Sequence, residues 1–131
     1  SDTERAAVEQ LKAQVAAARN DAAAKPEALP LGMPGSYWRS TDAVDPVAEA
    51  READVPMLVL QGARDIQVVD ADWQRWKGGF HGNDQATFRL YERLNHLGIA
   101  GEGEGSLAEY GTPGQVDAQL VADVAAWIKA R

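Results

Sequence analysis

The stretch from Val55 to Val69, Val-Pro-Met-Leu-Val-Leu-Gln-Gly-Ala-Arg-Asp-Ile-Gln-Val-Val, constrains the fold more than any other part of the chain. Its apolar run Met57–Leu60 is continuous, which is typical of a strand buried on both faces of a parallel sheet. Gly62 predicts a sharp turn after this strand, and Asp65 follows the turn. Sites in open parallel sheets form outside the carboxyl ends of the strands, so Asp65 is a candidate site residue.

A second strand is predicted over residues 86–91, where apolar and polar residues alternate as in a half-exposed strand at a sheet edge. The span 55–91 is therefore expected to form one strand–helix–strand unit with a right-handed crossover. His96 lies just beyond the second strand. Because adjacent parallel strands are about 4.8 Å apart, we expect their C-terminal loops to bring His96 within hydrogen-bond reach of Asp65.

A carboxylate and an imidazole in contact have a defined chemistry. The carboxylate fixes the histidine tautomer and stabilises the imidazolium that forms when the ring takes a proton from a serine hydroxyl. The residue types alone leave a second interpretation open, in which Asp65 caps its own turn and His96 packs in a loop.

The other segments are predicted from helix-forming and helix-breaking residues. Residues 3–24 are rich in good helix formers and predict a surface helix. Residues 25–41 contain three prolines and two glycines, which predicts no regular element. This loop is too apolar for a free linker, and it either packs on its own core or covers a ligand pocket, through Leu29, Leu31, Met33, Tyr37 and Trp38. Further helices are expected to start at Asp45-Pro46 and after the N-cap residues Asp70 and Asp117.

Composition restricts the partners of the chain. The 131 residues are enough for one domain, or a fragment of one, and their 45% hydrophobic and 25% charged content is ordinary for a soluble globular chain. A net charge of −7 disfavours nucleic acids and anionic membrane surfaces, and no apolar run approaches the roughly 18 residues of a spanning helix. The lack of cysteine excludes thiolate chemistry but is compatible with the cytosol or with export. The two histidines lack the spacing of a zinc site, so we expect no metal and no cofactor.

The sequence Leu-Val-Leu-Gln-Gly-Ala-Arg-Asp65-Ile-Gln-Val, with Asn95-His96-Leu97 following, resembles the C-terminal part of α/β-hydrolase-fold serine hydrolases. The closest resemblance is to the dienelactone-hydrolase and prolyl-oligopeptidase-like group of esterases and peptidases, whose triad follows the chain order Ser, Asp, His. The resemblance covers residues 45–131 and implies that Asp65 is the triad acid and His96 the triad base. It also implies that residues 1–44 form a helical lid or cap, whose substrate contacts would be Leu31, Met33, Tyr37 and Trp38.

The nucleophile of that family is missing from the sequence. Its serine lies in a Gly-x-Ser-x-Gly elbow, and none of the four serines of this chain does, which are Ser1, Ser36, Ser40 and Ser106. We therefore expect a C-terminal portion of a hydrolase that cleaves a small-molecule ester or amide, inactive alone, with the serine supplied elsewhere. Its partner would be a nucleophile-bearing N-terminal half or a second copy of the chain, since two strands are too few for a stable open sheet. The alternative is a small α/β binding or interaction domain without catalysis.

Overall fold

The computed structural model describes residues 2–131, except for the side chain of Glu4. The chain divides into two compact units, Ser1–Pro46 and Val47–Arg131. The boundary expected from the sequence, between residues 44 and 45, lies close to this division. The lid or cap role of the first segment stays a prediction.

The first unit is helical. It contains α1 (Asp2–Asn20), two short 3₁₀ helices (Pro26–Ala28 and Pro30–Gly32) and α2 (Gly35–Asp42). Its core is small and consists mainly of Leu29, which is almost completely buried, and Ala18 of α1. An exposed ion pair between Arg19 and Asp42, 2.8 Å long, joins the ends of α1 and α2.

Helix α2 corrects the expectation that residues 25–41 hold no regular element. The three prolines all lie before it, and the last, Pro34, is its N-cap, where the missing N–H costs nothing. Inside the helix, Ser40 and Thr41 return hydrogen bonds to the carbonyl of Tyr37. Helix α1 also ends earlier than predicted, at Asn20, because the carboxylate of Asp21 accepts the N–H of Ala23, two residues further along, in place of a helical carbonyl.

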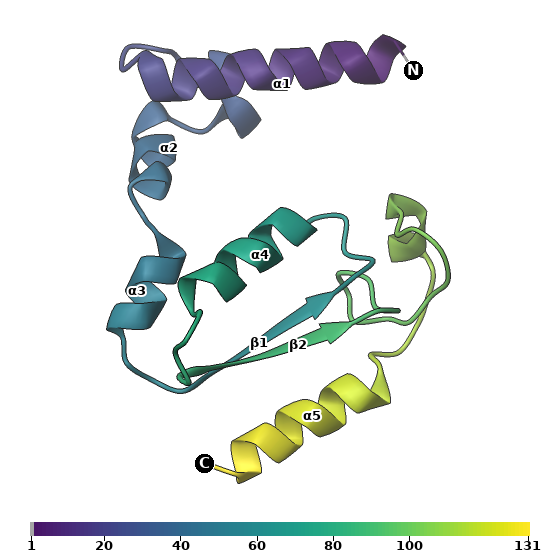
Figure 1. Ribbon diagram of the computed structural model, residues 1–131. Coiled ribbons are helices and arrows are strands. Elements are labelled where there is room, and N and C mark those ends of the chain that lie inside the picture. Colours follow the sequence, from purple (N-terminus) through teal and green to yellow (C-terminus); the bar gives the residue numbers. More distant parts are fainter. Residues whose placement is uncertain (1) are drawn as a thin grey trace. The chain divides into compact units, whose positions relative to one another are not determined.

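The second unit is an α/β structure. Its order is α3 (Pro46–Glu52), β1 (Met57–Gly62), α4 (Asp70–Gly79), β2 (Ala86–Tyr91), the 3₁₀ helix η3 (Leu107–Gly111) and α5 (Ala118–Lys129), as Figure 1 shows. The two strands are parallel and in register from Met57 opposite Ala86 to Gly62 opposite Tyr91. Helix α4 connects them, so their carboxyl ends lie side by side. No helix in the described part of the chain is long and apolar enough to cross a membrane.

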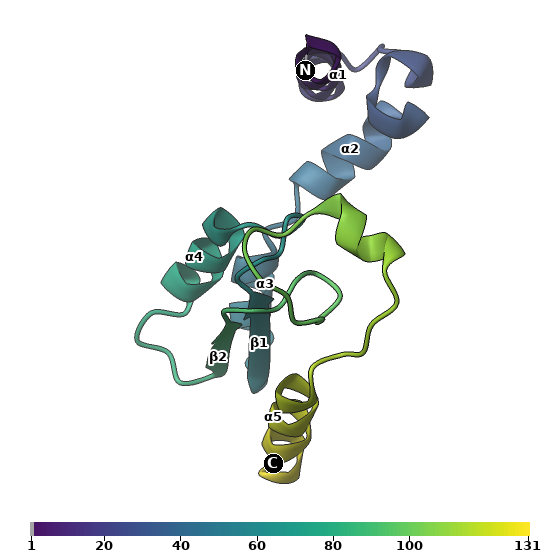
Figure 2. The same ribbon diagram turned by 90° about the vertical axis from the view of Figure 1, so that its right-hand side faces the viewer.

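Helices α4 and α5 lie on opposite sides of the two strands (Figures 1 and 2). On the α4 side, Trp73 packs edge-on against Phe88 of β2 with ring centroids 5.4 Å apart. Phe80 lies beside the same Phe88 ring at 6.2 Å and is buried. On the α5 side, the hydroxyl of Tyr91 donates to the Asp123 carboxylate at 2.9 Å. The alternating pattern of β2 thus directs its aromatic side chains to a different helix on each face.

The helix starts were predicted with mixed success. Asp117 is the N-cap of α5, as expected, and its carboxylate accepts the N–H groups of Gln119 and Leu120. Asp70 is the first helical residue of α4 rather than its N-cap, which is Val69. The N–H of Val69 donates to Asp72, so the second acidic residue makes the contact at this helix end.

The burial of β1 differs from the prediction of a strand buried on both faces. All residues of Met57–Gly62 are half-buried. The reason is that β2 is the only strand paired with β1 among residues 2–131, so one edge of β1 stays unpaired. A groove of about 550 Å³ runs along Met57–Leu60, and its other walls come from Trp76 of α4 and from Val124, Trp127 and Ile128 of α5.

Candidate functional site

Asp65 is held by the turn that follows β1. Its own N–H donates to the carbonyl of Gly62 at 3.1 Å. Its Oδ1 atom accepts the N–H groups of Gln67, at 2.8 Å, and Val68, at 3.0 Å. Only 8% of the side chain is exposed. The Asp therefore does cap its turn, as one interpretation of the sequence held, but this occupies only one of its two oxygens.

The loop after β2 runs beside the loop after β1 and carries His96. Parallel pairing continues past the strand ends, because Ala63 donates to the carbonyl of Tyr91 and Arg64 donates to the carbonyl of Leu94 at 3.0 Å. Gly62 permits this close approach, since a Cβ at that position would collide with the carbonyl oxygen of Leu94. The backbone hydrogen bonds thus bring the two loops together one residue before Asp65 and two residues before His96.

The second oxygen of Asp65, Oδ2, lies 2.9 Å from Nδ1 of His96. Burial of the Asp65 carboxyl acts to raise its pKa, but the hydrogen bonds from Val68, His96 and Gln67 outweigh it and hold that pKa below the usual range. An ionised carboxylate can only accept, so Nδ1 carries the shared proton. In the neutral ring this leaves Nε2 unprotonated, with no hydrogen-bond partner among the described residues of this unit.

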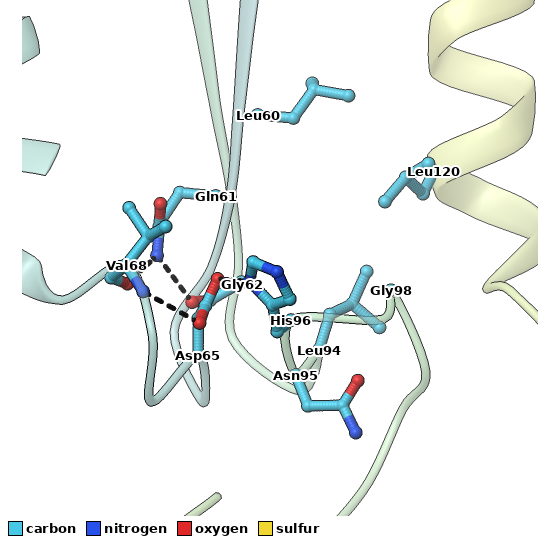
Figure 3. A pocket seen from close by; sticks show the side chains of 10 residues that line it. All are labelled: Leu60, Gln61, Gly62, Asp65, Val68, Leu94, Asn95, His96, Gly98 and Leu120. Atoms are coloured by element: carbon cyan, nitrogen blue, oxygen red, sulfur yellow. Dashed lines mark hydrogen bonds and ion pairs between the residues drawn. The ribbon is translucent and has the colours of Figure 1, made fainter. Parts of the chain in front are cut away.

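A pocket of about 300 Å³ contains this pair (Figure 3). The carboxyl and imidazole form one side of it, and the ring nitrogen of His96 that is not bound to Asp65 faces away from that carboxylate. The apolar lining of the pocket comes from Leu60 of β1, from Leu94 in the loop after β2 and from Leu120 of α5. With 37% of its side chain exposed, His96 is accessible to a group that enters the pocket. The arrangement can accept a proton at Nε2 and stabilise the resulting cation through Asp65.

The second unit offers His96 no nucleophile of its own among its described residues. Its one serine, Ser106, precedes η3 and makes no hydrogen bond to His96. Ser36 and Ser40 lie on α2 in the other unit. Among the side chains that the structure describes, no group of three or more His, Asp or Glu is arranged to hold a metal ion.

The four predicted substrate contacts lie in the first unit. Leu31 is 88% exposed, and its φ of 56° places it in the left-handed region. Tyr37 is exposed, Met33 is half-buried, and Trp38 lines a pocket of about 210 Å³ together with residues of α1 and α2. A role in substrate binding stays a prediction for all four.

Two residues beside the pair were not found by sequence reasoning. The Tyr110 ring lies near the His96 ring, with centroids 6.4 Å apart, and its hydroxyl accepts a hydrogen bond from Gln67. Glu109, next to it, contacts the side chain of the residue that precedes His96. Both come from the segment 100–114, which the sequence describes only as an acidic glycine-rich loop. The one available signal was the Ser106-x-x-Glu109 spacing, which is that of a capping box.

Comparison with known proteins gives one informative match. Over 103 residues the chain is 33% identical to the esterase EstD of Thermotoga maritima. The chain is similar in sequence to an esterase. The match covers 79% of this chain, which is more than residues 45–131 alone, so it includes part of the first unit. The chain spans about a quarter of the length of this relative. No protein-family model matches the chain, and no solved structure does.

This similarity relates the sequence of the chain to that of an esterase. It does not distinguish the dienelactone-hydrolase group from the prolyl-oligopeptidase-like group.

Proposed function

We propose that this chain supplies the acid and the base of a Ser-His-Asp triad in an α/β-hydrolase-fold serine hydrolase that cleaves an ester or amide. Asp65 is the acid and His96 the base. The serine comes from another segment, so the 131 residues alone are inactive. The substrate is a small-molecule ester or amide, and neither a cofactor nor a metal takes part.

The observation that carries the proposal is the 2.9 Å contact between Asp65 and His96 at the carboxyl ends of two adjacent parallel strands. Paired with the similarity to an esterase, this contact favours acyl transfer over a purely structural hydrogen bond. A structural pair has no need of an accessible second nitrogen, whereas Nε2 of His96, without a hydrogen-bond partner among the described residues, belongs to a side chain that lines a pocket.

The geometry assigns each group a step. Nε2 takes the proton of the serine hydroxyl as the oxygen attacks the carbonyl carbon of the substrate. The imidazolium is held by Asp65, whose lowered pKa keeps the carboxylate charged throughout. Nε2 then gives the proton to the leaving alcohol or amine, and an attacking water repeats the sequence to release the acid.

The unpaired edge of β1 supports a nucleophile-bearing segment as the partner. A strand with a free edge and apolar side chains invites pairing. The groove beside Met57–Leu60 is flanked by helices from both faces of the sheet, which is the space that another strand needs. The indole N–H of Trp127 is buried in this region without a hydrogen-bond partner in the described part of the chain, and an added backbone carbonyl would satisfy it. We favour a longer polypeptide over a second copy of this chain, because the 103 matched residues make up only 25% of the esterase relative.

Residues 1–44 would act as the lid of this enzyme. The exposed side chains of Leu31 and Tyr37 offer apolar surface that a substrate or the body of the enzyme would cover. Met33 and Trp38 would complete an apolar acyl or aromatic pocket.

A fluorophosphonate probe tests the proposal, since it labels only an activated serine. The 131-residue chain should remain unlabelled, while the longer polypeptide that contains it should be labelled once per molecule. His96→Ala in that polypeptide should abolish both labelling and ester hydrolysis. Labelling of the 131-residue chain, or hydrolysis that survives His96→Ala, would contradict the assignment.

Sedimentation of the isolated chain tests whether the unpaired edge of β1 needs a partner strand. We expect self-association or partial disorder at micromolar concentration, because the groove is uncovered. A compact, well-dispersed monomer would count against a missing strand and would favour the alternative, a small binding domain without catalysis.

A further inference from the structure

A cluster of three polar side chains, two of them buried and one partly exposed, lies beside the Asp65–His96 pair. It consists of Arg64, Asn95 and Glu109. Arg64 is the residue before Asp65, and Asn95 is the residue before His96. Both are buried, with 8% and 5% exposed, respectively. Polar groups in such positions need partners, and the contacts of this cluster supply them.

The carboxylate of Glu109 joins the two loops. Its Oε1 accepts Nη2 of Arg64 at 2.6 Å, and its Oε2 accepts Nη1 of Arg64 at 3.2 Å. The same Oε2 also accepts Nδ2 of Asn95 at 3.0 Å. The Glu109 side chain from η3 thus binds the residue before Asp65 and the residue before His96. Its contact with Arg64 is bidentate, a geometry that orients a guanidinium group well.

The rest of the Arg64 guanidinium organises the glycine-rich loop. Its Nε donates to the carbonyl of Gly103 at 2.7 Å, and Nη2 donates to that of Glu102 at 3.0 Å. The loop wraps closely around the arginine, since a Cβ at Gly101 would collide with the guanidinium and a Cβ at Gly105 with the Arg64 carbonyl. Replacement of either glycine is therefore blocked by the contact that holds Arg64.

Asn95 shapes the turn that presents His96. Its Oδ1 accepts the N–H groups of Leu97 at 3.0 Å and Ile99 at 3.2 Å, so the hydrogen bonds span His96. The backbone N–H of Gly98 donates to the Asn95 carbonyl, at a φ of +69° that suits glycine. The position of the imidazole thus depends on where the Asn95 side chain is held.

We propose that Glu109 is a positioning residue, which keeps His96 and Asp65 in hydrogen-bond contact by holding Asn95 and Arg64 at once. The effect of Glu109 on hydrolysis rests on the proposed function, whereas its effect on the contact between Asp65 and His96 does not. The hydrogen bond from Arg64, followed by that from Asn95, lowers the pKa of Glu109, so its carboxylate is charged at neutral pH. A neutral amide in its place offers one accepting oxygen instead of two, and either Asn95 or Arg64 loses its partner.

Nitrogen-15 NMR of the His96 ring in the 131-residue chain tests the structural part. The wild type should show a single tautomer with the proton on Nδ1. In Glu109→Gln we expect mixed tautomers and a broadened Nδ1 proton, with the far-UV circular dichroism retained. Glu109→Asp keeps the charge but shortens the side chain, and it provides the same readout in a milder variant. The matched control is Glu102→Gln, which removes only a surface ion pair between Glu102 and Arg93 on the same loop.

Kinetics of the longer, serine-containing polypeptide test the catalytic part. Because a displacement of about 1 Å can cost on the order of 100-fold in rate, Glu109→Gln should lower kcat by about 10-fold or more with KM changed by less than about 2-fold. Glu102→Gln should change neither.

The two proposals fail in different ways. A single, unchanged His96 tautomer in Glu109→Gln and Glu109→Asp overturns the positioning role, whatever the enzyme does. Hydrolysis that survives His96→Ala overturns the proposed function and leaves the NMR result to judge Glu109. Loss of thermal stability in Glu109→Gln with unchanged kcat and tautomer would assign Glu109 a purely structural role.

Discussion

Oδ2 of Asp65 lies 2.9 Å from Nδ1 of His96, although 31 positions separate the two residues along the chain. The contact forms because each residue follows one of two paired strands, and because backbone hydrogen bonds continue between the loops beyond the strand ends. Oδ1 of the same carboxylate is saturated by two N–H groups of its own turn, which leaves Oδ2 for the histidine. The carboxylate is thus oriented before the imidazole meets it.

Asp65→Asn should remove most of the activity of the serine-containing polypeptide. The amide no longer fixes the Nδ1–H tautomer or stabilises the imidazolium, and in triads of this kind such a change costs on the order of 10⁴ in kcat. The measurement is hydrolysis of a p-nitrophenyl ester. Asp70→Asn is the matched control, because Asp70 lies in the first turn of α4 and its carboxylate accepts a hydrogen bond from the exposed Gln74. A loss of less than about 10-fold in Asp65→Asn would be too small for a triad acid.

Acid should weaken the contribution of Asp65 to stability. A carboxyl whose pKa is lower in the folded chain stabilises the fold fully above its unfolded pKa, and this contribution disappears as the pH falls through the lower, folded value. The difference in unfolding free energy between wild type and Asp65→Asn should be constant above about pH 5 and shrink below about pH 4. Urea unfolding from pH 7 to pH 3 measures it. A difference that grew on acidification would have the wrong sign for this contact.

Tyr91 should titrate at a higher pH than an unperturbed tyrosine. Burial of its hydroxyl and its hydrogen bond to Asp123 raise the pKa of Tyr91 to about 12. The neutral phenol is favoured in the folded chain, so its stabilising effect is complete below about pH 10 and is lost as the pH rises toward the folded value. Absorbance at the tyrosinate band should show one late titration in the folded wild type, and Asp123→Asn should shift it to lower pH. Retention of the late step in Tyr91→Phe would assign it to another tyrosine.

Two glycines should respond oppositely to alanine. At Gly62 a Cβ would collide with the carbonyl of Leu94, where the two site loops meet, and backbone has little room to move. Gly62→Ala should therefore destabilise the fold by about 2 kcal/mol or more. At Gly78, inside α4, a Cβ meets no atom within 4 Å, and alanine should stabilise the helix by up to about 1 kcal/mol. Chemical denaturation compares them, and equal effects at both positions would contradict the packing seen at Gly62.

Local patterns in the sequence determined the elements that build the site. The apolar run at Met57–Leu60, the alternation at Ala86–Tyr91 and the N-cap at Asp117 depend on neighbouring residues and chain periodicity, so they can be read without the fold. The same reasoning anticipated that the loops carrying Asp65 and His96 meet. It failed at α2, because clustered prolines suggest a loop even where the last one starts a helix.

Only the tertiary structure decided what surrounds those elements. Glu109 reaches Arg64 from 45 positions away, and no local periodicity encodes a contact between a 3₁₀ helix and two distant loops. The half-burial of β1 likewise depends on which strands are present beside it, since an apolar run predicts burial but cannot state what provides it. The sequence therefore determined which two loops carry Asp65 and His96. The tertiary packing decided which side chains hold these loops in place and which edge of β1 stays unpaired.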